Sequence, residues 1–343
     1  MSSDESTVSN APTTVEKLRG LPWGVVWSVA NSVFAQYTFF GSIFVLFLNE
    51  LGLDKSQIGS LLSLLPFFGI LAVFIVTPVA RMGYKRAFLI GFGGRASAAL
   101  LLLLAPTILV QFGQGAVLSF IVVTLVIFGI FRSIGFTAYY PWQQEQIPDS
   151  VRGKYTAIRN VLSNLVAMGA MLAGGLLLGP DPAVNRFLLL ISIGVAFGAF
   201  SVGAATKMPG GAPTRADPSE QGSFREMLAA ARDRNFVRYL FGLGLVTAAT
   251  GPLTSFVPLF MKEQVGLNSD QVVWLDTAIL LGGLVSSYLW GWLADRYGSK
   301  PVMTSGAYLL PLLPLAWLLM PQQATWSLYL CLLYTSPSPR DRG

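Results

Sequence analysis

The side chains that could do chemistry are polar residues set inside long apolar stretches. Arg95, Arg132 and Asp276 each interrupt a run of about 20 mostly apolar residues. At the centre of a bilayer an Arg or Asp costs about 2.5–3.5 kcal/mol on insertion scales, whereas each Leu or Ile contributes only a few tenths. Such a side chain therefore needs water, a partner or a solute to bind. A buried structural ion, or a side chain that extends toward the membrane surface, is the alternative for each of them.

Covalent catalysis has little raw material in this sequence. His is absent and the one cysteine is Cys331, so a zinc site, a His-based acid/base pair and a Cys nucleophile are not expected. The sequence also shows no nucleotide-binding loop that would couple it directly to ATP. We expect no catalytic residue, no metal site and no cofactor, and therefore a protein that is not an enzyme.

The composition predicts that membrane-spanning helices position these polar residues. Of the 343 residues, 53% are hydrophobic and 12% are charged, whereas a soluble domain averages about 25% charged residues. The mean hydropathy is +0.59, which fits a bundle whose outer surface faces lipid. Nine stretches are long enough to span a bilayer, and a tenth begins near Trp326. Their approximate limits are 21–48, 57–79, 87–108, 116–140, 156–178, 186–206, 236–260, 271–294 and 302–320.

Basic residues alternate between the connections that join these stretches. One side holds Lys55, Lys262 and, near a helix end, Arg186, and the other side holds the larger set: Lys17, Arg19, Arg81, Lys85, Arg86, Arg152, Lys154, Lys207, Arg215, Arg225, Arg232, Arg234, Arg296 and Lys300. Positive residues stay on the cytosolic side during insertion. The pattern predicts a multi-pass protein of the cell membrane with a cytosolic N-terminus. The net charge of +6 is spread over loops and forms no single patch, so we expect no binding of nucleic acid.

Two sequence segments recur at nearly one spacing. FLNELGLDKSQIG (47–59) resembles FMKEQVGLNSDQVV (260–273), which places Gly52 and Gly266 at equivalent positions, 214 residues apart. VARMGYK (79–85) resembles ADRYGSK (294–300), with Gly83 and Gly298 215 residues apart. Because six is an even number, duplication of a six-helix unit yields two halves of the same orientation. The repeat predicts a parent protein with twelve spans.

The chain is expected to divide into five segments. These are a disordered cytosolic tail (1–20), an N-terminal six-helix bundle (21–206), a cytosolic linker (207–235), a partial C-terminal bundle (236–330) and a non-native tail (331–343). The first segment lacks the pattern of a signal peptide, and the linker is rich in Pro, Gly, Ser and charges. Residues 331–341, CLLYTSPSPRD, resemble the translation of a sequencing-library adapter, with a natural polar tail as the alternative. The adapter interpretation predicts a C-terminally truncated chain.

One loop carries the resemblance to a known family. Residues 291–300 read GWLADRYGSK, which resembles the GxLADRxGRK signature between the second and third helices of each half in the major facilitator superfamily. The matching residues are Gly291, Asp295, Arg296, Gly298 and Lys300, while Ser299 stands where the family usually has Arg. The resemblance implies that this loop helps to close the cytosolic gate. A solvated turn whose charges only set topology is the alternative.

The first half carries weaker versions of the same gating elements. The equivalent loop keeps Arg81, Gly83 and Lys85 but has Ala80 where the acid belongs. Between the fourth and fifth spans, Glu145 and Arg152 fit ExxPxxxRG, a pattern similar to the corresponding loop in sugar porters. The resemblance implies two ion pairs in a cytosolic charge network, Glu145 with Arg81 and Arg152 with Asp295.

The family resemblance implies both a fold and a mechanism. The fold is an all-α membrane protein with the major facilitator fold, built from two parallel six-helix repeats, the second incomplete, with about nine of twelve spans present. The function is secondary active transport of a small solute by alternating access, with an unknown substrate and with protons as a candidate coupling ion. The alternative is a non-transporting membrane receptor or assembly factor with the same architecture. We expect a monomer whose partners are the solute and the lipid bilayer.

The resemblance also implies where the solute binds. In the family the first, fourth, seventh and tenth helices surround it, which makes Asn31, Gln36, Arg132 and Thr250 candidate contacts. Hydrogen bonding between helices would explain the same residues equally well. Asp276 is the only clearly intramembrane carboxylate and is the candidate for proton coupling. The positive charge of Arg132 favours an anionic or polar solute.

Overall fold

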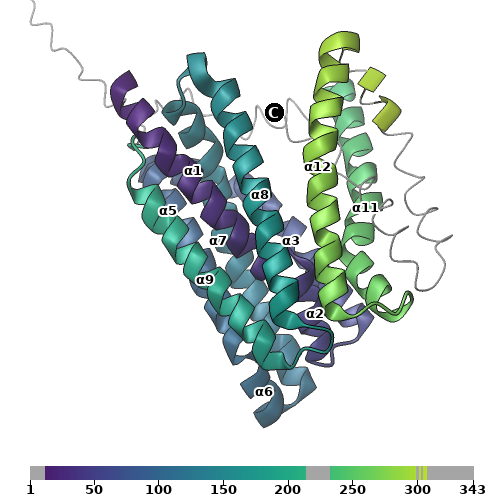
Figure 1. Cartoon of the computed structure of the whole chain (residues 1–343). Coiled ribbons are helices and arrows are strands. Elements are labelled where there is room, and N and C mark those ends of the chain that lie inside the picture. Colours follow the sequence, from purple (N-terminus) through teal and green to yellow (C-terminus); the bar gives the residue numbers. More distant parts are fainter. Residues whose placement is uncertain (1–11, 214–231, 299–300, 303, 307–343) are drawn as a thin grey trace, which may run out of the picture.

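A bundle of long helices makes up most of the molecule (Figure 1). The computed structural model describes residues 12–213, 232–298, 301–302 and 304–306. The α-helices are α1 (Thr14–Tyr37), α2 (Ser42–Glu50), α3 (Lys55–Phe67), α4 (Leu71–Met82), α5 (Tyr84–Leu101), α6 (Ala105–Phe112), α7 (Gln114–Gln146), α8 (Arg152–Leu178), α9 (Val184–Thr206), α11 (Arg234–Glu263) and α12 (Ser269–Tyr297). Three 3-10 turns, η1 (Phe68–Ile70), η2 (Leu102–Leu104) and η3 (Asp149–Val151), join some of them.

Six helical segments of the described residues are long and apolar enough to cross a membrane. They are Thr14–Glu50, Lys55–Met82, Tyr84–Phe112, Gln114–Gln146, Asp149–Leu178 and Val184–Thr206, and they overlap the six spans predicted for the N-terminal bundle. Helices α11 and α12, with 30 and 29 residues, overlap the seventh and eighth predicted spans. The predicted tenth span, the adapter-like tail, linker residues 214–231 and most of the ninth span lie outside the described residues.

The first helix begins earlier than the sequence analysis predicts. Residues 14–20 belong to α1 and not to a disordered tail, while residues 1–11 lie outside the described part. The cause is a capping box at Thr13: its hydroxyl accepts the Glu16 N–H at 3.3 Å, and the Glu16 carboxylate accepts the Thr13 N–H at 2.8 Å. These bonds satisfy backbone donors that a helix start otherwise leaves without partners.

Close backbone contact holds α5 against α7. A Cβ atom on Gly91 of α5 would lie 2.4 Å from the backbone nitrogen of Gly135 of α7, so only glycine allows this approach. Helix α1 lies between α8 and α9, and α8 also packs against α12. Large apolar side chains fill the interior of the bundle, including Phe34, Phe44, Phe88 and Phe128.

The structure reproduces the internal repeat at its turns. Gly52 and Gly266 have φ of 79° and 78°, and Gly83 and Gly298 have φ of 94° and 85°. These values lie in the left-handed region that glycine adopts most readily. Residues matched by the sequence repeat therefore share one backbone conformation in both halves.

The helix starts that follow these turns also match. The Asp54 N–H donates to Gln57 Oε1, and the Asn268 N–H donates to Gln271 Oε1, each at 3.0 Å. Asp54 and Asn268 are 214 residues apart, the same spacing as Gly52 and Gly266. Equivalent side chains thus begin equivalent helices, α3 and α12.

The two ends of the bundle differ in charge and in contacts. We call the end with Arg81, Lys85 and Arg152 the basic end, and the end with the turns at Gly52, Gly179 and Gly266 the opposite end. At the opposite end Lys55 pairs with Glu263, Lys262 Nζ donates to Asn49 Oδ1 at 3.3 Å, and the Ser269 N–H donates to the Pro180 carbonyl at 3.4 Å. In Figure 1, α8 and α12 approach each other toward the bottom and diverge toward the top. The described contacts of α11 and α12 with the N-terminal bundle thus concentrate at the opposite end.

Candidate functional site at the break in the first span

The first span is interrupted at residues 38–41, between α1 and α2. The Phe40 N–H donates to the Ala35 carbonyl at 3.2 Å, and the chain then turns so tightly that a Cβ atom on Gly41 would lie 2.2 Å from the Gln36 carbonyl oxygen. Gly41 is therefore required for the turn. Because α2 starts inside the bundle, the backbone N–H groups of its first turn need partners there.

Asp276 of α12 supplies one of those partners. Its Oδ2 accepts the Ser42 N–H, the first residue of α2, at 3.1 Å. A carboxylate at a helix N-terminus also interacts favourably with the positive end of the helix dipole. Asp276, predicted as a coupling residue, thus links α12 to the break in the first span.

Arg95 is held deep inside the N-terminal bundle. Only 3% of its surface is exposed, and its Nη2 donates to Asn31 Oδ1 of α1. Its guanidinium carbon lies 4.5 Å from the ring centroid of Phe34 and 4.3 Å from that of Phe92. Asn31, predicted as a solute contact, therefore serves as a hydrogen-bond acceptor for Arg95.

Arg132 of α7 lies beside the break. Its guanidinium carbon is 5.3 Å from the centroid of Phe40 and 5.2 Å from that of Phe136. The side chain is half-buried, and its Nε is buried without a hydrogen-bond partner in the described part of the chain. Among the predicted solute contacts it is the one with a charged group next to the break. The Thr250 side chain lies outside the described residues, and Gln36 lies in the last turn of α1.

The sequence analysis missed a third arginine inside a span. Arg159 of α8 donates from Nη1 to the Tyr139 hydroxyl of α7 at 2.7 Å and lies 5.9 Å from the centroid of Tyr155. It lies seven residues after the start of α8, or about 10 Å along the helix. The rule that singled out Arg95 would have found it, because Arg159 also interrupts an apolar run.

At the basic end, the predicted gating residues bind the start of the linker. Lys85 Nζ donates to the Met208 carbonyl at 2.6 Å, and the Lys85 N–H donates to the Gly211 carbonyl at 3.2 Å. Trp142 Nε1 donates to the Pro209 carbonyl at 3.0 Å, and Glu145 Oε2 accepts the Gly211 N–H at 3.0 Å. We call residues 207–213 the strap, because α5 and α7 hold them across the end of the bundle.

The predicted ion pair between Glu145 and Arg81 is wrong for this structure. Lys55–Glu263 and Arg152–Asp149 are the ion pairs of the described residues. Arg81 is exposed in the last turn of α4, and the strap occupies the Glu145 carboxylate instead.

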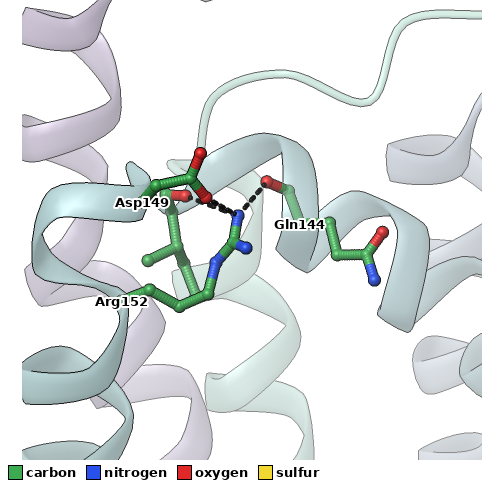
Figure 2. A network of polar contacts seen from close by, with 4 residues as sticks. Gln144, Asp149 and Arg152 are labelled. Carbon is green, nitrogen blue, oxygen red and sulfur yellow. Dashed lines mark hydrogen bonds and ion pairs between the residues drawn. The ribbon is translucent and has the colours of Figure 1, made fainter. Parts of the chain in front are cut away.

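Arg152 also has a local partner, shown in Figure 2. Its Nη2 lies 2.7 Å from Asp149 Oδ1, three residues earlier, and 3.3 Å from the carbonyl oxygens of Gln144 and Ile147. The predicted partner Asp295 has a side chain outside the described part of the chain, as has Gly291, and Lys300 lies outside it entirely. Arg296 is exposed at the end of α12.

We expect Glu145→Ala to loosen the strap. Loss of the hydrogen bond to the Gly211 N–H costs about 0.5–1.5 kcal/mol, so amide exchange at residues 209–211 should accelerate roughly 2- to 10-fold. Hydrogen–deuterium exchange of the purified protein measures this rate. Arg81→Ala is the control and should leave exchange in the strap unchanged. Equal acceleration in both variants would favour the pair of Glu145 with Arg81 over the observed contact.

Comparisons with known proteins identify sequences and folds that are similar to this chain. The sequence model described as Major Facilitator Superfamily matches residues 26–337. The structure of the nucleoside transporter NupG aligns with a TM-score of 0.70 at 15% identity, covering 94% of this chain and 80% of that one. A bacterial homologue of the human lysosomal transporter Spinster, in an inward-facing conformation, aligns with a TM-score of 0.68 at 15% identity, covering 94% and 74%.

A third solved structure has the same fold. A D-xylose–proton symporter aligns with a TM-score of 0.58 at 14% identity, covering 94% of this chain and 80% of that one. At these identities the likeness concerns the fold. The search of curated proteins found no match.

Proposed function

The chain belongs to the Major Facilitator Superfamily, and we propose that it is a secondary transporter that moves a small solute by alternating access. The observation that carries the proposal is the uneven contact between the halves: α11 and α12 meet the N-terminal bundle at the opposite end, through Lys55–Glu263, Lys262–Asn49 and Ser269–Pro180. Two halves joined at one end can rock about a central site.

The orientation of the chain follows from its basic residues. We place the basic end in the cytosol and the protein in the cell membrane, because Lys and Arg stay on the inner side during insertion. The structure then corresponds to an inward-open state, closed at the outer end. Arg152, paired with Asp149 in this state, would be available to pair with Asp295 when the inner end closes.

The solute site is the region of the break. Gln36, Arg132 and Thr250 come from the first, fourth and seventh spans, and in a broken helix the irregular backbone is tolerated where it lines a cavity. Asn31 contributes by holding Arg95. A twelve-span parent acting as a monomer would complete the second bundle.

Asp276 is the coupling candidate because its charge state bears on the contact between the halves. The carboxylate accepts the Ser42 N–H and stabilises the N-terminus of α2. Protonation would weaken this contact and favour separation of α12 from α2. A proton gradient could thereby bias the conformational cycle.

Counterflow in proteoliposomes tests the proposal. The purified protein, reconstituted with and without a pH gradient, should exchange a labelled solute across the membrane, and Asp276→Asn should remove any dependence on pH. No solute movement under any gradient would contradict transport, and solute binding without movement would identify a non-transporting member. Labelling of a cysteine introduced by Lys154→Cys, in a Cys331→Ser background, tests orientation: a membrane-impermeant maleimide should reach it from the inner side only.

A further inference from the structure

The N-terminal bundle carries intramembrane cations without carboxylates to neutralise them. Arg95, Arg132 and Arg159 lie within α5, α7 and α8. The acidic residues between residues 21 and 206 all lie at helix ends or in turns: Glu50, Asp54, Glu145, Asp149 and Asp181. A charge inside a membrane is costly without a partner, so each arginine has to be accounted for separately.

Arg159 is accounted for by hydrogen bonds. It donates to the Tyr139 hydroxyl at 2.7 Å and to Asn160 Oδ1 at 3.5 Å. Arg132 differs, because among the described residues no oxygen accepts a hydrogen bond from it and its contacts are the faces of Phe40 and Phe136. A guanidinium has five N–H donors, and those of Arg132 remain open to a ligand.

Arg95 adds a second positive charge behind Arg132. Phe128 connects the two residues: it lies one turn before Arg132 on α7, and its ring centroid is 5.9 Å from the Arg95 guanidinium carbon. Arg95 is 3% exposed, and its Nε is buried without a partner among the described residues. Aromatic faces and Asn31 stabilise this cation, but they do not neutralise it.

The surroundings of Arg132 are aromatic and accessible. Phe40 in the break is 46% exposed and Tyr140, two turns after Arg132, is 61% exposed. Phe136 lies between them, with centroid distances of 5.2 Å to the Arg132 guanidinium carbon and 6.4 Å to the Tyr140 ring. An apolar ring can pack on this surface while an attached anion reaches the guanidinium.

We propose that Arg132, with Arg95 behind it and Phe40 and Phe136 beside it, binds the anionic group of an organic solute with an apolar or aromatic body. A carboxylate, phosphate or sulfonate would accept two parallel hydrogen bonds from the guanidinium and neutralise the uncompensated charge. The identification of this anion with the transported solute rests on the proposed function, whereas the site itself does not.

Thermal unfolding of the purified chain in detergent tests the site. The probes are benzoate, phenyl phosphate and benzenesulfonate, compared with neutral benzamide and with inorganic phosphate and sulfate. At least one aromatic anion should raise the melting temperature in a saturable way, with at least fivefold higher apparent affinity than benzamide and the inorganic anions. No stabilisation by any aromatic anion, equal binding of benzamide, or equal binding of an inorganic anion would overturn the proposal.

Variants locate the binding. Arg132→Gln should weaken binding of the aromatic anion at least tenfold, and Arg132→Lys should retain part of it, because it keeps the charge and loses the paired donors. Arg159→Gln, which also removes an intramembrane cation, should leave the affinity unchanged. If Arg132→Gln does not fold, an Arg132→Lys variant with full affinity would overturn the proposal.

The outcome is separable from that of the transport assay. Binding of an aromatic anion that depends on Arg132, without counterflow, would support this site and contradict transport. Counterflow of a neutral solute at the same rate in the parent and in Arg132→Gln would support transport and overturn this site.

Discussion

Asp276→Ala should slow cross-linking between the two halves at the opposite end about tenfold or more. The cysteines are introduced by Asn49→Cys and Lys262→Cys in a Cys331→Ser background, at side chains that are 3.3 Å apart in the parent. A short bis-maleimide joins them when that end is closed, and gel mobility measures the rate. A hydrogen bond to a charged group contributes about 1.5–3 kcal/mol, equivalent to roughly a 10- to 150-fold change in population.

The opposing effect is desolvation. Burying the Asp276 carboxylate costs free energy that the alanine variant no longer has to meet. The bond to the Ser42 N–H should still dominate, because without it the N-terminus of α2 is left with an unpaired donor inside the bundle. Asp276→Asn keeps an acceptor and should therefore slow cross-linking less than Asp276→Ala.

Glu263→Gln is the matched control at the same end. The Lys55–Glu263 pair is solvent-exposed, and exposed pairs typically contribute about 0–1 kcal/mol, so its loss should change the cross-linking rate little. A parent-like rate for Asp276→Ala would show that this carboxylate does not hold the halves together.

The elements of the N-terminal bundle could be predicted because each depends on a local property. An apolar run of sufficient length specifies a span wherever it packs, so the six segments overlap the predicted ones. The turns at Gly52 and Gly83 have their counterparts at Gly266 and Gly298 because a left-handed conformation favours glycine in each repeat. The family match over residues 26–337 confirms the family that the loop at 291–300 resembles.

The partners of the polar side chains could not be predicted in the same way. Asn31 and Arg95 are 64 residues apart and meet because α1 and α5 pack in one bundle. The break at 38–41 contains no proline and depends on the close turn at Gly41, so hydropathy alone reads the segment as one continuous span. Family patterns suggested a partner for Arg152 in the other half, whereas Asp149, one helical turn away, provides a local one.

Gly175→Val should oppose closure of the same end by steric means. A Cβ atom at Gly175 of α8 would lie 2.1 Å from Nε1 of Trp274 and 3.1 Å from the Asp270 carbonyl oxygen of α12. The Trp274 indole cannot move away freely, because its Nε1 donates to the Leu172 carbonyl at 3.3 Å. Overpacking of this kind costs about 1–3 kcal/mol, so the cross-linking rate between positions 49 and 262 should fall roughly fivefold or more.

Gly169→Val provides the control for the change of side chain. Gly169 lies on the same helix, and a Cβ atom there would meet nothing within 4 Å, so both variants carry the same loss of glycine from α8 while only one obstructs α12. A reduction confined to Gly175→Val would show that the approach of α8 and α12 closes the opposite end. Equal rates in the two variants would mean that α12 reaches its closed position without the contact at Gly175, and the closing contact would then have to lie at Asp276 alone.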